Sequence, residues 1–210
     1  ASSGAVDSVR FNTRTRSLDC TLIQRDAARP QPAAGLCGSG VISTVAELLR
    51  AGVITKSGSF DPAFKSPCLQ PGRNGTLAFE IVSGQDARGG RPIVLTQADV
   101  QAVQLAKGAL RAGIELLCRE NNIQRPSKLL LAGAFGSYIN KADALCIGMF
   151  PEMPAEDIEV VGNAAGAGAV LALCSDAHMG ASEDFARRTR VFDLAVHPDF
   201  QNTFIEQLSF

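Results

Sequence analysis

The hydrophobic pattern of this chain has one short, wholly apolar run as its clearest feature. It spans Leu129–Ala132 and is broken at once by Gly133 and Gly136. A second unit of similar build follows, in which Ile158–Val161 precedes Gly162 and Asn163. An apolar run without alternation is typical of a strand buried on both faces. Ligands of open α/β sheets bind beside the turns that follow such strands. The pattern therefore predicts two strand–turn–helix units that form the floor of a nucleotide site. Taken alone, Gly133 and Gly136 also fit a plain connection that needs glycine only for its dihedral angles.

Alternating polarity marks the start of the chain. Apolar positions alternate through Ala5–Asn12 and recur in Ser17–Gln24, which predicts a β-hairpin at the edge of a sheet. Residues 26–34 hold two prolines and are predicted to be a loop. We therefore treat residues 1–34 as an edge hairpin and loop.

A glycine-rich turn, Gly35–Gly40, leads into a predicted helix at Val41–Ala51, which Gly52 is placed to end. Backbone N–H groups at a helix N-terminus suit phosphate, so Gly35, Gly38, Ser39 and Gly40 are candidate nucleotide contacts. No Gly-Lys-Ser/Thr follows, which excludes a Walker loop. A tight turn that lets the helix pack close to the sheet is the other interpretation, and the sequence leaves both open.

The middle of the chain, residues 35–175, is predicted to be the main α/β lobe. Residues 55–75 are rich in Gly, Pro and Ser and are predicted to be a surface insertion that Phe60 and Phe64 hold down. Two strands, at Leu77–Val82 and Arg91–Leu95, precede a long helix of about 20 residues that begins with a capping box at Thr96 and Asp99. Lys107 and Arg111, one turn apart on this helix, are predicted to face solvent, and contact with a phosphate or an acidic partner is the alternative.

Small residues dominate the segment after the second glycine turn. Asn163 is a candidate cap for a helix at Ala164–Cys174, whose interior glycines each cost about 1 kcal/mol relative to alanine. A helix or ligand that approaches closely would offset this cost. The extension at 176–210 is predicted to hold a helix at Ser182–Arg188, a short strand at Val191–Leu194 and a helix at Pro198–Leu208, with an aromatic face suited to core packing or a subunit interface.

Composition narrows the class of protein. The chain has 210 residues, a formal net charge of −1, and 46% hydrophobic residues. This balance describes an ordinary soluble core without the basic surface that nucleic acid requires. The longest apolar run is too short for a membrane helix. No two of the six cysteines form a CxxC pair, so we expect reduced cysteines in a cytoplasmic protein and no metal site.

Several segments together carry a family resemblance. They are Gly35–Ile54, Val103–Ile114, Leu130–Ile139, Val161–Ala169 and Asp199–Phe204. In this combination the chain resembles the C-terminal domain of the reductive activators of corrinoid-dependent methyltransferases. That domain belongs to the superfamily of acetate kinase, sugar kinases, chaperones and actin.

The resemblance implies a fold and a site. The fold is an α/β, ribonuclease-H-like (actin-like ATPase) lobe, with a mixed sheet flanked by helices, that is partial relative to the full two-lobed fold. ATP, with magnesium, would bind between the two lobes. Leu130–Ile139 resembles the adenosine motif, so Gly133, Ala134, Phe135 and Gly136 are candidate contacts. Val161–Ala169 resembles the second connecting helix of the superfamily, so Gly162 and Asn163 are further candidate nucleotide contacts.

The resemblance also implies a function. The full activators use ATP to return the cobalt of a corrinoid protein to its reduced state, and they carry a 2Fe–2S cluster in an N-terminal domain. This sequence holds neither the Asp-Gly-Thr phosphate turn nor a cysteine cluster, so we expect both outside it. We therefore assign no catalytic residue to this sequence, and we expect the fragment alone to be inactive. A stand-alone kinase or acyltransferase is disfavoured. The alternative is a non-catalytic module for homodimerisation or corrinoid-protein contact through the tail.

Overall fold

A computed structural model describes residues 2–24, 31–72 and 75–210 of the chain; within these ranges the side chains of 134, 135, 137 and 195 are not described. The strands are β1 (Ala5–Asn12), β2 (Ser17–Leu22), β3 (Gly35–Leu36), β4 (Leu69–Pro71), β5 (Leu77–Val82), β6 (Ile93–Thr96), β7 (Leu129–Ala132) and β8 (Ile158–Gly162). The helices are α1 (Gly38–Arg50), α2 (Gln97–Glu120), α3 (Gly133–Tyr138), α4 (Lys141–Cys146), α5 (Ala164–Cys174), α6 (Asp176–Arg188) and α7 (Phe200–Glu206). Short 3₁₀ turns are η2 (Ala155–Asp157) and η3 (Leu194–Val196).

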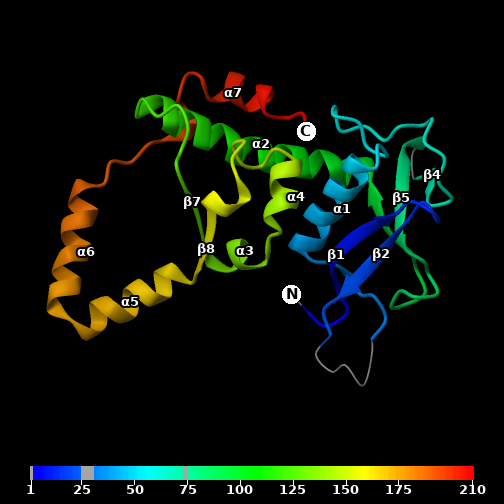
Figure 1. The fold of residues 1–210 in the computed structure, drawn as a ribbon, viewed down its shortest axis with the longest axis horizontal. Helices are drawn as coiled ribbons and strands as arrows, with labels where there is room; N and C mark the ends of the chain where they lie inside the picture. Colours follow the sequence, from blue (N-terminus) through cyan, green and yellow to red (C-terminus); the bar gives the residue numbers. More distant parts are fainter. Residues whose placement is uncertain (1, 25–30, 73–74) are drawn as a thin grey trace.

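The strands form three small sheets. One has the order β2-β1-β3, with β1 antiparallel to β2 and parallel to β3. The second is the antiparallel set β4-β5-β6, and the third is the parallel pair β7-β8. The long helix α2 crosses the molecule and joins the half that holds the first two sheets to the half that holds the third (Figure 1). The α/β class and the mixed sheet are as the sequence predicts.

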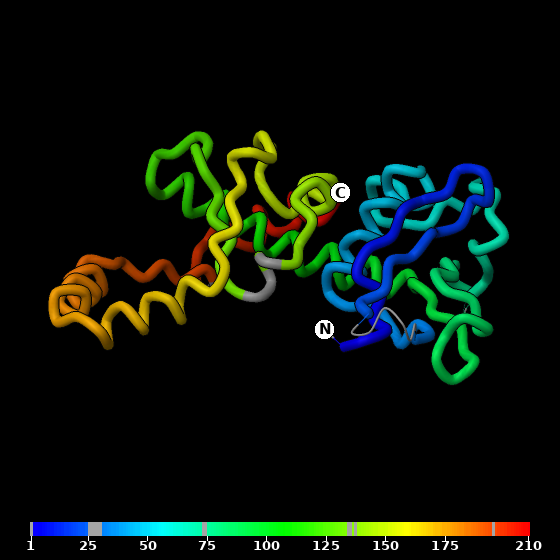
Figure 2. Tube along the Cα trace, turned by 60° about the horizontal axis from the view of Figure 1, so that its bottom comes forward, coloured from blue at the N-terminus to red at the C-terminus, as the bar shows by residue number. Residues whose placement is uncertain are grey.

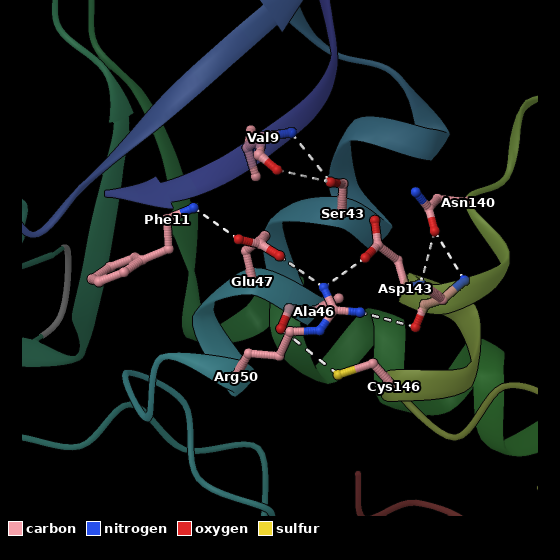
Figure 3. Close-up of polar contacts among 10 residues, drawn as sticks. Val9, Phe11, Ser43, Ala46, Glu47, Arg50, Asn140, Asp143 and Cys146 are labelled. Atoms are coloured by element: carbon pink, nitrogen blue, oxygen red, sulfur yellow. Dashed lines mark hydrogen bonds and ion pairs between the residues drawn. The ribbon is translucent and has the colours of Figure 1, made fainter. Parts of the chain in front are cut away.

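Helix α1 closes the open edge of β1. β3 pairs only with the first two residues of β1, so the N–H groups further along that edge need other partners. Ser43 accepts from the backbone N–H of Val9 at 3.1 Å, and Glu47 accepts from that of Phe11 at 2.8 Å (Figure 3). Four helical residues rise about 6 Å and two strand residues about 6.8 Å, so one helix face matches the strand.

The ends of α1 follow from its glycines. A Cβ on Gly40 would lie 2.1 Å from the carbonyl oxygen of Val6, so only glycine allows α1 to approach β1 this closely. Gly52 has φ +74° after the last turn, and the N–H groups of Gly52 and Val53 bond the carbonyls of Leu49 and Leu48. This is a Schellman motif, and it confirms the predicted helix end.

Helix α2 has the predicted capping box. Thr96 accepts from the Asp99 N–H at 3.2 Å, and Asp99 accepts from the Thr96 N–H at 2.8 Å. With 24 residues the helix is about 36 Å long. The predicted solvent position of Lys107 is wrong, since this side chain is only 1% exposed.

The tail explains why Lys107 is buried. The Lys107 ammonium donates to the carbonyl of Ser209 and lies 5.5 Å from the centroid of the Phe210 ring. Gln104 donates to the Leu208 carbonyl at 3.1 Å. A Cβ on Gly108 would lie 3.2 Å from Leu208 and 3.4 Å from Phe204, so a small residue is needed where the tail crosses. The aromatic tail therefore packs on α2 of its own chain.

The predicted insertion at 55–75 holds regular structure. Phe60 is buried, and Phe64 packs edge-on against Phe11 with 6.1 Å between ring centroids, as predicted for anchors. Strand β4 lies in this segment and pairs with β5. The Gly and Pro content of the segment gave no sign of this strand. The predicted strand at Val191–Leu194 is wrong because no strand is assigned there, while α6 begins six residues earlier than predicted.

Strand β7 is not buried on both faces. Leu129 and Leu131 are half-buried against the core, but Leu130 is 59% exposed on the opposite face. An apolar run shows that both faces of a strand carry apolar side chains. It does not show that other parts of the protein pack against both faces. In the described part of the chain nothing covers the outer face of β7.

Helices α5 and α6 form an arm. They contact each other and extend away from the rest of the molecule in two views (Figures 1 and 2). No residue of either helix is buried. None of the described helices is both long enough and apolar enough to cross a membrane.

Candidate nucleotide site

The carboxyl ends of β7 and β8 meet at one edge. The two strands are parallel, with Leu129 opposite Ile158 and, after a register shift between Leu131 and Ala132, Ala132 opposite Gly162. Gly133, which starts α3, and Gly162, which precedes α5, therefore stand beside each other at the strand ends. The structure brings together the two glycine turns that the sequence singles out.

Both turns need glycine and both are open. Gly133 has φ +82° and Gly162 has φ +66°, a region that side chains with a Cβ rarely adopt. A Cβ added at either position would meet no atom within 4 Å. Neither glycine carries a side chain, and the space that a Cβ would occupy is open, which leaves room for a planar ring or a ribose to approach.

Gly136 has a packing role. Its added Cβ would lie 2.8 Å from the Cβ of Leu131 and 2.9 Å from its carbonyl carbon. Glycine here lets α3 turn back onto β7. The side chains of the neighbouring candidates Ala134 and Phe135 lie outside the described residues.

Asn163 caps α5, as the sequence predicts. Its Oδ1 accepts from the Gly166 N–H at 3.0 Å. A Cβ on Gly166 would lie 2.4 Å from the Asn163 Nδ2, so this interior glycine makes room for the cap. The cap offsets part of the helical cost of Gly166. The Nδ2 has no hydrogen-bond partner among the described residues and is available as a donor.

The third glycine segment is built differently. Ser39 Oγ donates to Asp7 Oδ1 at 2.5 Å, and Cys37 Sγ lies 3.5 Å from the same oxygen. The space beside Gly40 is occupied by β1, which α1 approaches closely at this position. Gly35, with φ +149°, and Gly38 have no neighbour within 4 Å of an added Cβ. Since a carboxylate beside Ser39 repels phosphate, the geometry favours the packing interpretation for Ser39 and Gly40.

A polar network ties this edge to the hairpin half. Arg50 Nη1 lies 2.7 Å from both Glu47 Oε1 and Asp143 Oδ1, and its Nη2 donates to the Ala142 carbonyl at 2.9 Å (Figure 3). Asp143 is buried on α4, the helix that follows α3. Asn140 caps α4 by accepting from the N–H groups of Ala142 and Asp143 at 2.9 and 3.1 Å. The network fixes α4, and with it the end of α3, on α1.

Sequence reasoning identified the Asn140 cap but missed the ion-pair network and Asp7. The partners Arg50 and Asp143 are 93 positions apart, and no local pattern connects them. Asp7 lies in an alternating strand and carries no distinguishing neighbour. Only Glu47 and Arg50, three apart on one helix, gave a local signal.

The cysteines do not form a cluster. All six are free, and no group of three or more His, Cys, Asp or Glu side chains in the described ranges is arranged to hold a metal ion. Burial, with a smaller contribution from Asp19, raises the pKa of Cys20 to about 11. The described residues of this chain therefore do not fit an iron–sulfur centre.

Comparison with known proteins identifies the family. The family described as "C-terminal domain of RACo the ASKHA domain" matches residues 1–210. The chain belongs to this family. It is 35% identical over 184 residues to the "Corrinoid activation enzyme RamQ" of Eubacterium limosum, covering 84% of this chain and 31% of the relative.

A solved structure has the same fold. The "Reductive activator for corrinoid, iron–sulfur protein" superposes on the whole chain with a TM-score of 0.85 and 28% sequence identity, over 33% of its own length. This likeness supports the actin-like ATPase fold. This chain thus spans about a third of the length of the relatives that it matches.

Proposed function

We propose that this chain is the ATP-binding part of a reductive activator that returns the cobalt of a corrinoid protein to its reduced state. Membership of the RACo-type ASKHA family gives the class, and the relatives are named as corrinoid activators. The observation that carries the ATP site is the edge at which the turns of Gly133 and Gly162 meet, both with positive φ and with open space where a Cβ would stand.

The residues present fit a nucleotide in part. Gly133 and Gly162 leave room for the adenosine, and the Asn163 Nδ2 and the N-terminus of α5 offer donors. None of the described residues that form this edge is a lysine or an arginine, so the phosphates and their magnesium ion would be held by other groups of the longer protein. ATP bound there supplies the free energy that drives electron transfer uphill.

Partner and location belong to the same proposal. The partner is a corrinoid protein, the iron–sulfur cluster lies in polypeptide outside this chain, and the activator works in the cytoplasm. Activity then needs the longer protein, while this part contributes the nucleotide edge.

The proposal is tested by titrating ATP into the parent protein and three glycine-to-valine variants. Gly133→Val and Gly162→Val block the edge, and Gly52→Val is the matched control because Gly52 has a similar φ and equally open surroundings at the far end of α1. Valine would be strained in all three variants, because each position has a positive φ. We expect the two edge variants to bind ATP at least about tenfold more weakly, and Gly52→Val to bind as the parent does. Equal binding by all four proteins would exclude this edge.

A second candidate function, an interaction module, rests on a separate observation. The α5–α6 arm exposes large apolar side chains and buries none. Solvent-exposed apolar surface of this kind marks a site of protein contact.

A further inference from the structure

A cavity of about 480 Å³ lies beside α2, away from the glycine turns. Its walls are α2, residues 124–126 before β7, residues 145–152 before β8, and the tail at 207–210. Because β7 and β8 are parallel, the segments that precede them meet at the amino ends of the strands, whereas Gly133 and Gly162 stand at the carboxyl ends. The cavity is therefore separate from the candidate nucleotide site.

A buried positive charge lines this cavity. Lys107 is 1% exposed, and its ammonium donates to the Ser209 carbonyl and lies over the Phe210 ring. Among the described residues no carboxylate forms an ion pair with it. Burial, with a smaller contribution from Arg111, lowers the pKa of Lys107 to about 8, so the group still carries most of its charge at pH 7. Buried charges in proteins are normally paired, and the described residues leave this one without a counterion.

Arg111 brings a second cation to the same wall, one turn along α2. Its Nε and Nη2 donate to Glu115 Oε1 at 3.0 and 2.8 Å, and its Nη1 donates to the Phe150 carbonyl at 2.6 Å. These contacts fix the guanidinium and leave further N–H donors for another acceptor. Two cations on adjacent turns of one helix face repel each other, and an anion between them would offset that repulsion.

The charges of the wall favour a ligand with one negative charge. Three bases, Lys107, Arg111 and Arg125, and two acids, Glu115 and Glu152, line the cavity, which leaves an excess of one positive charge. A monocarboxylate would balance that excess, whereas a phosphate dianion would exceed it.

Apolar side chains form the rest of the wall, and they favour a ligand with an apolar part. They include Ile114, Leu145, Phe150 and Phe210. A volume of about 480 Å³ lies within the range of sites for small organic molecules.

We propose that the cavity between α2, residues 145–152 and the tail binds a small monocarboxylate, with its carboxylate on Lys107 and Arg111 and its apolar part against Ile114 and Leu145. A carboxylate there would accept charge-assisted hydrogen bonds from both cations. The proposal is independent of ATP binding, because the two sites lie at opposite ends of β7 and β8.

Two cysteines in the wall report whether the cavity is occupied. Cys118 and Cys146 line it and are half-buried, and Cys68 is the matched control because it is half-buried outside this cavity. The experiment follows alkylation of the full protein that carries this chain, by mass spectrometry, with hexanoate as the probe. At about ten times its dissociation constant, hexanoate should slow the alkylation of Cys118 and Cys146 about tenfold and leave that of Cys68 unchanged. No protection of the two cavity thiols overturns the proposal, as does equal protection of all three.

Two further probes test the chemistry of the ligand. Hexanamide has the shape of hexanoate without its charge, and it should give no protection at the same concentration. Inorganic phosphate should protect less than hexanoate does. Equal protection by hexanamide would show that the cations take no part in binding, and stronger protection by phosphate would overturn the assignment to a monocarboxylate.

The role of Lys107 is tested by isothermal titration of hexanoate into variants of the full protein. Lys107→Met keeps an unbranched side chain and removes the charge, and Lys128→Met is the control because the Lys128 side chain is 66% exposed outside the cavity. Hexanoate affinity should fall at least about tenfold in Lys107→Met and stay unchanged in Lys128→Met. Equal affinity in both variants overturns the proposal. ATP affinity should be the same in both, which separates this site from the nucleotide edge. If Lys107→Met does not fold, thiol protection in the parent protein still decides the question.

Discussion

Glu47 accepts a hydrogen bond from the backbone N–H of Phe11 at 2.8 Å, while its other oxygen pairs with Arg50 at 2.7 Å. One carboxylate thus closes the edge of β1 and anchors the ion pair that reaches Asp143 on α4. An unpaired strand edge is a site for pairing with another chain, and a helix side chain removes that possibility here.

Glu47→Ala should lower the free energy of unfolding by about 1–3 kcal/mol, because it leaves the Phe11 N–H and the Arg50 guanidinium with fewer partners. Urea denaturation measures the change. Glu156→Ala, at an exposed position of η2, is the control and should unfold like the parent. A Glu47→Ala protein as stable as the parent would show that water replaces the carboxylate without cost.

Two glycines at the start of α1 should respond oppositely to the same substitution. An added Cβ on Gly40 would lie 2.1 Å from the Val6 carbonyl oxygen, and one on Gly38 would meet nothing within 4 Å. Gly40→Ala should destabilise the fold by about 1–3 kcal/mol or more, since helix and strand must separate. Gly38→Ala should be neutral or stabilising by up to about 1 kcal/mol. Thermal unfolding of the Gly40→Ala and Gly38→Ala variants measures both effects. It shows whether glycine is needed in this turn so that α1 can pack closely on β1.

Lys107 should make stability depend on pH in the alkaline range. Burial, with a smaller contribution from Arg111, lowers the pKa of Lys107 from 10.5 to about 8. Between these values the unfolded chain binds more protons than the folded one, so the free energy of unfolding due to this group rises with pH from about 8 to 10.5.

The comparison with Lys107→Met isolates the effect of Lys107. The pKa of Cys20, raised to about 11, gives the opposite slope above its ordinary value near 9, but it is present in both proteins. The difference between the two unfolding curves should therefore change through this window. A constant difference across the window would contradict a shifted Lys107.

Removing Gln207–Phe210 should destabilise the chain. The Lys107 ammonium and the Gln104 amide both donate to carbonyls of this segment, and Phe210 packs against the core, so its removal loses two hydrogen bonds and apolar contacts. We expect a loss of about 1–3 kcal/mol, measured by urea denaturation. Because the tail covers Lys107, truncation should also expose its ammonium to water and return its pKa toward 10.5.

Cysteine alkylation followed by mass spectrometry should rank the thiols. Cys174 is exposed on α5 and should react first. Cys20 should be among the slowest at pH 8, because its raised pKa leaves little of the reactive thiolate.

Local chemistry was enough to determine most elements from the sequence. The capping box at Thr96 and Asp99, the Asn140 and Asn163 caps and the Gly52 helix end are all present, because each depends on residues within one helical turn. The two strand–turn units were also predictable. Parallel pairing of their strands then placed Gly133 beside Gly162, as expected for neighbouring strands of an open sheet.

Tertiary structure decided what lies against each surface. The sequence pattern made Leu130 a buried position and Lys107 a solvated one, and both assignments are reversed. Apolarity shows which side chains gain by burial, but whether a face is covered depends on segments far along the chain. The C-terminal tail, about 100 residues distant, covers Lys107, and none of the described residues covers the outer face of Leu130.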